Sequence, residues 1–293
     1  MKIGLHDSDD TKYPNLALMK LSAWHKQQGD TVSFFTPLEE YEKIYSSKVF
    51  TWSKDHYLPS NALRGGAGYK NYHGLPDYVE HICPDYSLYG IDYSMGFLTR
   101  GCPNNCTWCI VPFKEGYIKP HSDIEEFLQH KKVILMDNNI LACDHGIQQI
   151  EKIAKLKLKV DFNQGLDARL IDEGAAKRLS RLNWLAPLRL SCDTQSQMSA
   201  ILKAVTLLRW YNTVPRRYYV NVLVKDIDDA LERVRFLKGL DLDPFAQPYR
   251  DYDNKVTVAP EQKNFARWVN HKAVFKSTTW ENYKSNKRMQ ADN

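Results

Sequence analysis

The part of the chain after residue 90 alternates short apolar segments with helical patterns, and no other feature limits its possible folds as strongly. Six segments have the composition of β-strands, namely residues 95–99, 133–136, 160–163, 188–191, 218–224 and 245–249. After the first interval, their centres recur about every 28 residues, which is the length of one βα unit. Because repeated βα units build parallel sheets, we predict an α/β fold in which six units form a partial barrel.

The first 84 residues form a separate predicted region. Residues 2–5 and 31–35 have strand composition, and a helical pattern between them begins near Pro14 and ends at Gly29. This order predicts a small Rossmann-like domain. A glycine-rich stretch at residues 64–69 lacks a complete phosphate-binding motif, so we interpret it as a flexible linker. The predicted domains are residues 1–84, 85–250 and 251–293.

An acidic run, from His6 to Asp10, follows the first predicted strand. Such a run can bind a metal ion or a substrate amine. A solvated loop or a helix cap is the commoner role of this pattern, and it is the interpretation that we favour.

Three cysteines, Cys102, Cys106 and Cys109, lie in one short loop after the first strand of the predicted barrel. Thiolates are soft ligands that select iron–sulfur clusters or zinc. A structural zinc site normally has four protein ligands, whereas a [4Fe–4S] cluster held by three cysteines leaves one iron free. The spacing therefore predicts an iron–sulfur site with a catalytic role.

This CxxxCxxC spacing, with Trp108 just before the third cysteine, resembles the signature of the radical S-adenosylmethionine (radical SAM) enzymes. The resemblance implies a TIM-like (β/α)6 partial barrel and a [4Fe–4S] cluster whose free iron binds S-adenosylmethionine (SAM). It also implies reductive cleavage of SAM to a 5′-deoxyadenosyl radical, with an electron donor such as flavodoxin or ferredoxin. The N-terminal region is similar to the branch with a cobalamin-binding domain. The Asp-x-His-x-x-Gly motif of that domain is missing, so we do not expect cobalamin.

Polar residues follow the predicted strands, where a barrel places its active site. The resemblance implies that several of them contact SAM. Asp137 lies where the family binds the methionine amino group, and Arg169 can pair with the methionine carboxylate. The full set of candidates is Trp108, Asp137, Asn138, Asn139, Asn163, Gln164, Asp167, Arg169, Ser191, Asp193 and Val222. Some of these residues could instead cap the helices that follow.

Cys192, at the end of the fourth predicted strand, is the weak candidate for a catalytic residue. If its thiol faces the mouth of the barrel, it could donate a hydrogen atom or act as a nucleophile. A buried and inert cysteine is the commoner alternative.

The net charge of +5 mildly favours an anionic partner. The C-terminal extension from Lys263 to Arg288 carries seven basic residues interleaved with aromatic ones. Such a segment can bind nucleic acid, but we favour a solvated basic helix whose aromatic side chains pack on the barrel.

The substrate could be a small molecule, a peptide or a nucleic-acid-related compound. The alternative to an enzyme is a non-catalytic nucleic-acid-binding protein with a structural iron–sulfur or zinc site. No apolar run approaches the ~20 residues that span a bilayer, and the N-terminus does not have the pattern of a secretory signal. We therefore expect a cytoplasmic protein with no membrane partner.

Overall fold

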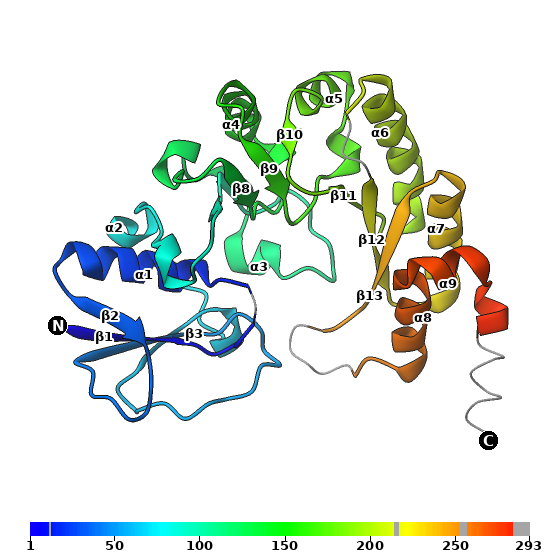
Figure 1. The fold of residues 1–293 in the computed structure, drawn as a ribbon. Coiled ribbons are helices and arrows are strands. Elements are labelled where there is room, and N and C mark those ends of the chain that lie inside the picture. The colour runs from blue at the N-terminus through cyan, green and yellow to red at the C-terminus, as the bar shows by residue number, and fades with distance from the viewer. Residues whose placement is uncertain (12, 214–216, 252–256, 284–293) are drawn as a thin grey trace.

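The computed structural model describes residues 1–11, 13–213, 217–251 and 257–283, and shows a mixed α/β fold with parallel sheets (Figure 1). The N-terminal half contains a four-stranded parallel sheet in the order β2-β1-β3-β4. Its strands are β1 (Lys2–Asp7), β2 (Thr31–Phe34), β3 (Lys43–Ser47) and β4 (Leu63–Gly65). The helices here are α1 (Leu16–Gln27) and α2 (Asp77–Glu80), with 3-10 turns η1 (Ala67–Tyr69) and η2 (Tyr86–Leu88).

Apolar side chains of β1 pack against α1 and stabilise this sheet. Ile3 and Leu5 of β1 are fully buried and pack in one cluster with Leu18 and Leu21 of α1. Asn15 begins the helix, because its side chain accepts a hydrogen bond from the backbone N–H of Leu18. The predicted β-α-β start of the chain is therefore present.

The glycine-rich stretch is not a linker, which corrects our interpretation. It forms β4 and η1, and β4 pairs with β3 at the edge of the N-terminal sheet. Gly66 has a φ of 101°, and a Cβ atom there would lie 2.4 Å from the carbonyl oxygen of Lys48. Its glycines thus permit close packing of two backbones. The sequence misled us because β3 and β4 are short and rich in serine and glycine.

The second half contains two parallel sheets. One has the order β10-β9-β8-β5 and the other β11-β12-β13. A parallel bridge between Leu166 and Leu190 joins them. The strands are β5 (Ser94–Gly96), β8 (Lys132–Leu135), β9 (Lys159–Phe162), β10 (Asn183–Trp184), β11 (Leu188–Ser191), β12 (Tyr218–Val224) and β13 (Asp243–Pro248). Each of the six predicted segments overlaps one of these strands, while β10 was not predicted.

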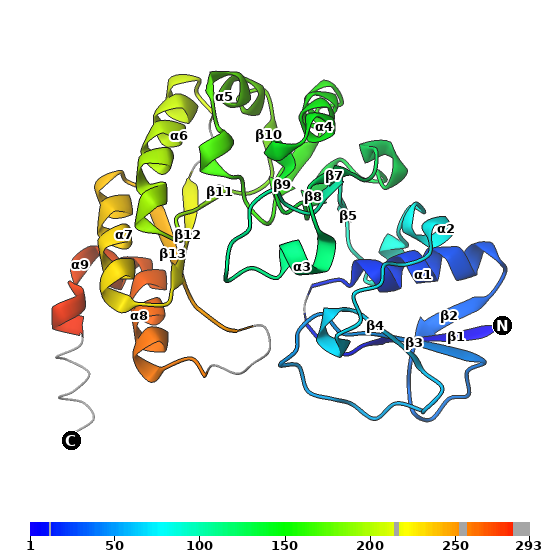
Figure 2. The same cartoon turned by 180° about the vertical axis from the view of Figure 1, so that it is seen from behind.

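Helices cover one side of this row of strands, and the N-terminal half lies on the other side (Figures 1 and 2). The covering helices are α4 (Asp144–Lys155), α5 (Glu173–Leu179), α6 (Met198–Trp210) and α7 (Ile227–Gly239). The short helix α3 (Val111–Glu115) lies on the side of the N-terminal half, while α8 (Pro260–Asn270) and α9 (Lys272–Ser277) pack beside β13 (Figure 1). The 3-10 turns are η3 (Ile124–Glu126), η4 (Ile140–Ala142), η5 (Ala168–Leu170) and η6 (Gln195–Gln197). Asp226 caps α7, because its side chain accepts a hydrogen bond from the N–H of Asp229.

The aromatic residues of the C-terminal extension are part of the core. Phe265, Trp268, Phe275 and Trp280 are all buried and belong to the same cluster as the strands of the second half. Their rings pack on one another, with 5.0 Å between the centroids of Trp268 and Phe275. This confirms the packed-helix interpretation for the described part of the extension. Lys284, Lys287 and Arg288 lie outside the described residues.

Among the described residues, no helix combines the length and the apolar character needed to cross a bilayer.

Candidate functional site

The cysteine loop lies between two short strands, β6 (Thr99–Arg100) and β7 (Lys119–Pro120), which form an antiparallel pair after β5. Gly101 makes the base of this loop possible. Its φ is 82°, and a Cβ atom there would lie 2.4 Å from the carbonyl oxygen of Tyr117. Cys102 then donates its N–H to the carbonyl of Gly116, at 3.2 Å. The loop is therefore closed by a backbone contact that requires glycine.

The three thiols of the loop lie close enough to affect one another. Cys102 and Cys106 are half-buried and Cys109 is exposed. Burial raises the pKa of the Cys106 thiol, and the neighbouring Cys109 and Cys102 raise it further. Burial likewise raises the pKa of Cys109, with an added contribution from Cys102. A positively charged group bound between these sulfurs would favour their thiolate forms.

Asp167, which precedes η5, connects three segments at this site. Its carboxylate accepts a hydrogen bond from Asn104 of the cysteine loop, at 3.0 Å, and one from Asn139 after β8, at 3.1 Å. It also forms a bidentate pair with Arg169, at 2.8 and 2.7 Å. Although burial acts to raise it, the hydrogen bonds from Arg169 and Asn104 hold the pKa of Asp167 below its usual value. Arg169 is thus engaged with a protein carboxylate, which differs from its predicted pairing with methionine.

Asn139 is the buried polar residue nearest to the cysteines in this network. Its Nδ2 also donates to Cys102 Sγ, at 3.7 Å. Its Oδ1 is buried and has no hydrogen-bond partner within the described residues. Because an unsatisfied buried acceptor costs about 1–3 kcal/mol, this oxygen is suited to receive a donor from a ligand.

Asp137 has a role that the sequence did not predict. Its buried carboxylate accepts hydrogen bonds from Leu98 N–H and from the N–H and hydroxyl of Thr99, just before the cysteine loop. Burial raises the pKa of Asp137 to about 6, and the hydrogen bonds from Thr99 and Leu98 oppose this shift without cancelling it. Asp137 therefore holds the entry to the loop, and its carboxylate neither faces an open site nor caps the next turn.

Glu115, at the end of α3, supports the loop from its other side. Its carboxylate accepts from Gly101 N–H at 3.2 Å, from Asn138 Nδ2 at 2.9 Å and from Arg100 Nε at 3.2 Å. Glu115 thereby connects the start of the cysteine loop, at Gly101, and the end of α3 to Asn138, which follows β8.

The remaining candidates lie in different environments. Asn163 and Gln164 are exposed at the end of β9, and Ser191 is half-buried at the end of β11. Asp193 accepts from the N–H of Leu223 at 3.1 Å, and burial raises its pKa. The side chain of Val222 is fully buried in the core, so it does not reach the exposed strand ends.

Cys192 is also fully buried in the core. Burial raises the pKa of its thiol to about 11. Its Sγ lies 3.9 Å from the carbonyl of Thr194. These facts fit the alternative of an inert packed cysteine better than that of a reactive thiol.

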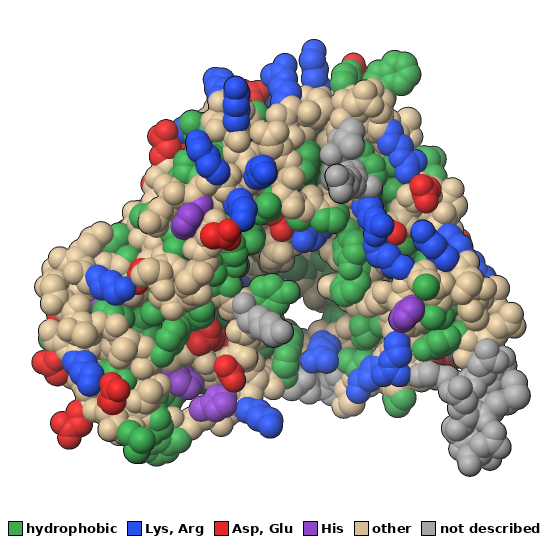
Figure 3. Space-filling model, viewed as in Figure 1, with side chains coloured by type: hydrophobic (Ala, Val, Ile, Leu, Met, Phe, Trp, Pro, Cys, Tyr) green, Lys and Arg blue, Asp and Glu red, His purple; other side chains and the backbone are tan. Residues whose placement is uncertain are grey.

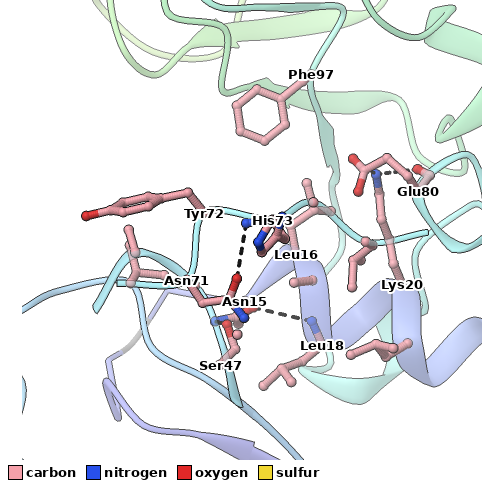
Figure 4. Close-up of a pocket in the computed structure, with 18 of the residues that line it drawn as sticks. Asn15, Leu16, Leu18, Lys20, Ser47, Asn71, Tyr72, His73, Glu80 and Phe97 are labelled. Carbon is pink, nitrogen blue, oxygen red and sulfur yellow. Dashed lines mark hydrogen bonds and ion pairs between the residues drawn. The ribbon is translucent and has the colours of Figure 1, made fainter. Parts of the chain in front are cut away.

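A cavity of about 840 Å³ lies between the N-terminal sheet and the cysteine loop region (Figure 4). On the N-terminal side, the first turn of α1 and the loop carrying Tyr72 and His73 line it. Phe97, Arg100 and Glu115 line the opposite side, and Figure 4 shows Phe97 projecting into the space from above. Ligands of open parallel sheets bind at the carboxyl ends of the strands, and β3 and β4 end at this cavity.

Three residues of the site were missed from the sequence: Asn104, Glu115 and Lys225. Lys225 directly follows β12, and its ammonium lies 5.0 Å from the ring of Trp108. The rule that strand ends carry functional residues could have found it. Asn104 and Glu115 have no pattern that distinguishes them, since only the fold brings their partners together.

No protein-family model matches the chain, and no curated protein matches it in sequence. Comparison with solved structures shows a fold similar to that of a radical SAM enzyme. The particular structure is that of OxsB, a cobalamin-dependent S-adenosylmethionine radical enzyme with aqua-cobalamin and S-adenosylmethionine bound. The TM-score is 0.52 with 13% identity, and the match covers 94% of this chain and 56% of OxsB. The likeness at this identity shows the fold, and the chain spans little more than half of the length of OxsB.

Proposed function

We propose that this protein is a radical SAM enzyme whose six parallel strands form a partial (β/α)6 barrel around a [4Fe–4S] cluster. The observation that carries the proposal is the loop with Cys102, Cys106 and Cys109, which lies after β5 and beside the unpartnered oxygen of Asn139. The similarity of the fold to a radical SAM enzyme supports it. When bound, the cluster and SAM supply a 5′-deoxyadenosyl radical, which abstracts hydrogen from a substrate.

The residues of the chain hold and orient the reactants in this proposal. Cys102, Cys106 and Cys109 would hold the [4Fe–4S] cluster and would leave one iron free for SAM. Asn139 Oδ1 accepts a hydrogen bond from the SAM ammonium, and Asp167 keeps Asn139 and the cysteine loop in place. Further contacts to SAM are proposed for Trp108, Asn138, Asn163, Gln164, Ser191 and Asp193. The cavity beside Phe97 would receive the substrate and position it.

The chemistry of the donor set fits a cluster better than a single metal ion. The loop offers three thiolates, one fewer than the four protein ligands of a typical structural zinc site. In a [4Fe–4S] cluster each thiolate binds a different iron, so the sulfurs surround the cluster and do not converge on one point. Three neighbouring thiols with an unsatisfied acceptor beside Cys102 suit this arrangement.

The test is anaerobic reconstitution with iron and sulfide. We expect a brown protein with a [4Fe–4S] absorption spectrum, which releases 5′-deoxyadenosine when dithionite and SAM are added. Cys106→Ala should lose both the cluster and the product. Cys83→Ala is the matched control, because Cys83 is exposed and lies outside the loop, and it should keep both.

Two results would contradict the proposal. Stoichiometric zinc with no 5′-deoxyadenosine would favour the non-catalytic alternative, in which the metal is structural. A full cluster in Cys106→Ala would show that other residues are the ligands.

We propose that the enzyme works without cobalamin, although OxsB contains it. The support is the missing Asp-x-His-x-x-Gly motif in residues 1–84. Titration of the reconstituted protein with aqua-cobalamin, followed by gel filtration, should leave no corrinoid absorbance with the protein. Retention of one corrinoid per chain, together with loss of that retention in His73→Ala, would overturn this part of the proposal, because His73 lines the cavity.

A further inference from the structure

We propose that the mouth of this site binds a single-stranded nucleic acid, whose bases stack on an aromatic track that runs from the cysteine loop to the N-terminal half. The aromatic track consists of Trp108, Lys225, Tyr249, Arg250, Trp52 and Phe50. The inference rests on the proposed function, because it names the substrate class of the same site.

The track begins on the barrel side, next to the cysteines. Trp108 lies between Cys106 and Cys109, and Lys225 Nζ is 5.0 Å from the centroid of its ring. The same ammonium lies 4.5 Å from the ring of Tyr249. Lys225 and Tyr249 directly follow β12 and β13, and the N–H of Tyr249 donates to Val224 at 3.0 Å. Two exposed strand ends therefore carry this part of the track.

The track then crosses to the N-terminal half. The guanidinium carbon of Arg250 lies 5.1 Å from the ring of Trp52. Trp52 stacks on Phe50, with 4.9 Å between the ring centroids and 23° between the ring planes. Two series of contacts, Trp108–Lys225–Tyr249 and Arg250–Trp52–Phe50, thus adjoin where Tyr249 and Arg250 follow one another in the chain.

The loop that carries Phe50 and Trp52 is held in one shape. The carboxylate of Asp9 accepts from Val49 N–H at 2.6 Å, from Phe50 N–H at 3.1 Å and from the Ser53 hydroxyl at 2.6 Å. A buried Lys48 pairs with Asp55 at 2.7 Å. The acidic run after β1 is therefore part of this loop's support, and the aromatic rings are presented without a large entropic cost on binding.

The rings nevertheless remain open to solvent. Trp52 is 44% exposed and Phe50 is 38% exposed. Phe113 and Tyr117, on and after α3, are more than 70% exposed on the other side of the cysteine loop. Exposed aromatic rings next to a catalytic opening mark a binding surface, because their contact with water is unfavourable.

Alternating cations and aromatic rings fit a single-stranded nucleic acid. Each base has a π-face that stacks on an aromatic ring, while lysine and arginine bind the phosphates between bases. Figure 3 shows Lys and Arg side chains gathered along the right edge of the hollow between the two halves. The cavity between the two halves, at about 840 Å³, is large enough for a nucleotide-sized group.

The test measures binding of labelled single-stranded RNA and DNA oligonucleotides to the reconstituted full-length protein by fluorescence anisotropy. We expect binding of at least one of them, with an affinity that falls as salt concentration rises. Trp52→Ala and Arg250→Glu should each weaken the affinity about 10-fold, whereas Trp52→Phe should retain most of it. Trp210→Ala is the matched control, since Trp210 is 81% exposed on α6, away from the track, and its affinity should equal that of the wild type.

Thermal unfolding of each variant shows that a loss of affinity is not a loss of folding. The inference is overturned if neither oligonucleotide binds, if Trp52→Ala and Arg250→Glu bind like the wild type, or if a duplex of the same sequence binds equally well. The last result would mean that base stacking contributes nothing.

The two proposals fail independently in this experiment. Oligonucleotide binding that depends on Trp52, in a protein that forms no 5′-deoxyadenosine, would overturn the proposed function and keep the track. Formation of 5′-deoxyadenosine without oligonucleotide binding would overturn the track alone.

Discussion

At the scale of single residues, the site depends on carboxylates that hold other groups in position. Asp137 fixes the turn before the cysteine loop, Glu115 fixes its base, and Asp167 joins the loop to the ends of β8 and β9. Each accepts several hydrogen bonds, so one substitution removes several contacts. In the proposed function, these carboxylates would act on the reactants through other residues, which makes them positioning residues.

The clearest residue-scale prediction concerns Asp167. Asp167→Ala removes the acceptor shared by Asn104, Asn139 and Arg169, so Asn139 is no longer held beside Cys102. We expect SAM to bind about 10-fold more weakly, the size of effect that follows from losing a hydrogen bond to a charged group. The iron content should stay near that of the wild type, because the three cysteines are unchanged. Equilibrium dialysis with SAM and iron analysis measure the two quantities.

Asp172→Asn is the control for this substitution. It removes a nearby carboxylate, but asparagine caps a helix as well as aspartate does, so α5 should keep its N-cap. An unchanged SAM affinity in Asp167→Ala would contradict the positioning role.

At the scale of elements, the N-terminal half is attached to the second half by a half-buried ion-pair network. Lys20 of α1 donates to Glu80 at the end of α2, at 2.7 Å, and His121 after β7 lies 3.2 Å from the same carboxylate. Burial acts to raise the pKa of Glu80, but the hydrogen bonds and charges of His121 and Lys20 outweigh it and hold the pKa at about 2. Burial lowers the pKa of Lys20, so the stabilisation is carried mainly by the carboxylate.

This network predicts a pH-dependent stability. A carboxyl group whose pKa is lower in the folded protein stabilises the fold above its ordinary pKa of 4.5, and this stabilisation is lost as the pH falls towards about 2. Glu80→Gln should therefore lower the free energy of unfolding by about 3 kcal/mol at neutral pH. At pH ~3 the difference in the free energy of unfolding between the wild type and Glu80→Gln should be about half as large. At that pH, part of the stabilisation by the Glu80 carboxylate has already been lost. Urea unfolding at the two pH values measures it.

Glu151→Gln is the comparison for Glu80→Gln. Glu151 forms an exposed pair with Arg178, and such pairs contribute little, so we expect Glu151→Gln to unfold like the wild type at either pH. A Glu80→Gln effect of equal size at both pH values would show that the ionisation of Glu80 does not matter for attachment of the two halves.

At the scale of the whole molecule, the candidate site lies where the two halves meet. The N-terminal half supplies one wall of the cavity and the stacked rings of Phe50 and Trp52. The second half supplies the cysteine loop and the exposed ends of β12 and β13. The aromatic residues that first suggested nucleic-acid binding, in the C-terminal extension, are buried in the core. We therefore propose the mouth of the site, and not the extension, as the surface that binds nucleic acid.

The sequence by itself determined the local features of this protein. The six strand segments were predictable because apolar and β-branched runs recur at the period of a βα unit, and α1 was predictable from its apolar spacing. The cysteine loop was evident because its chemistry lies within nine consecutive residues, Gly101 to Cys109. Patterns of this kind involve residues close together in the chain, so they can be recognised without knowledge of tertiary contacts.

Only the tertiary structure decided which side chains meet. Asn104 and Asn139 share Asp167 although 35 residues separate them in the chain, and Trp52 meets Arg250 from the opposite half. The strands β3 and β4 escaped prediction because backbone pairing, and not an apolar pattern, holds them. Burial likewise placed Cys192, Val222 and the aromatic residues of the extension in the core. Such contacts depend on how distant segments pack, and a single sequence does not record that packing.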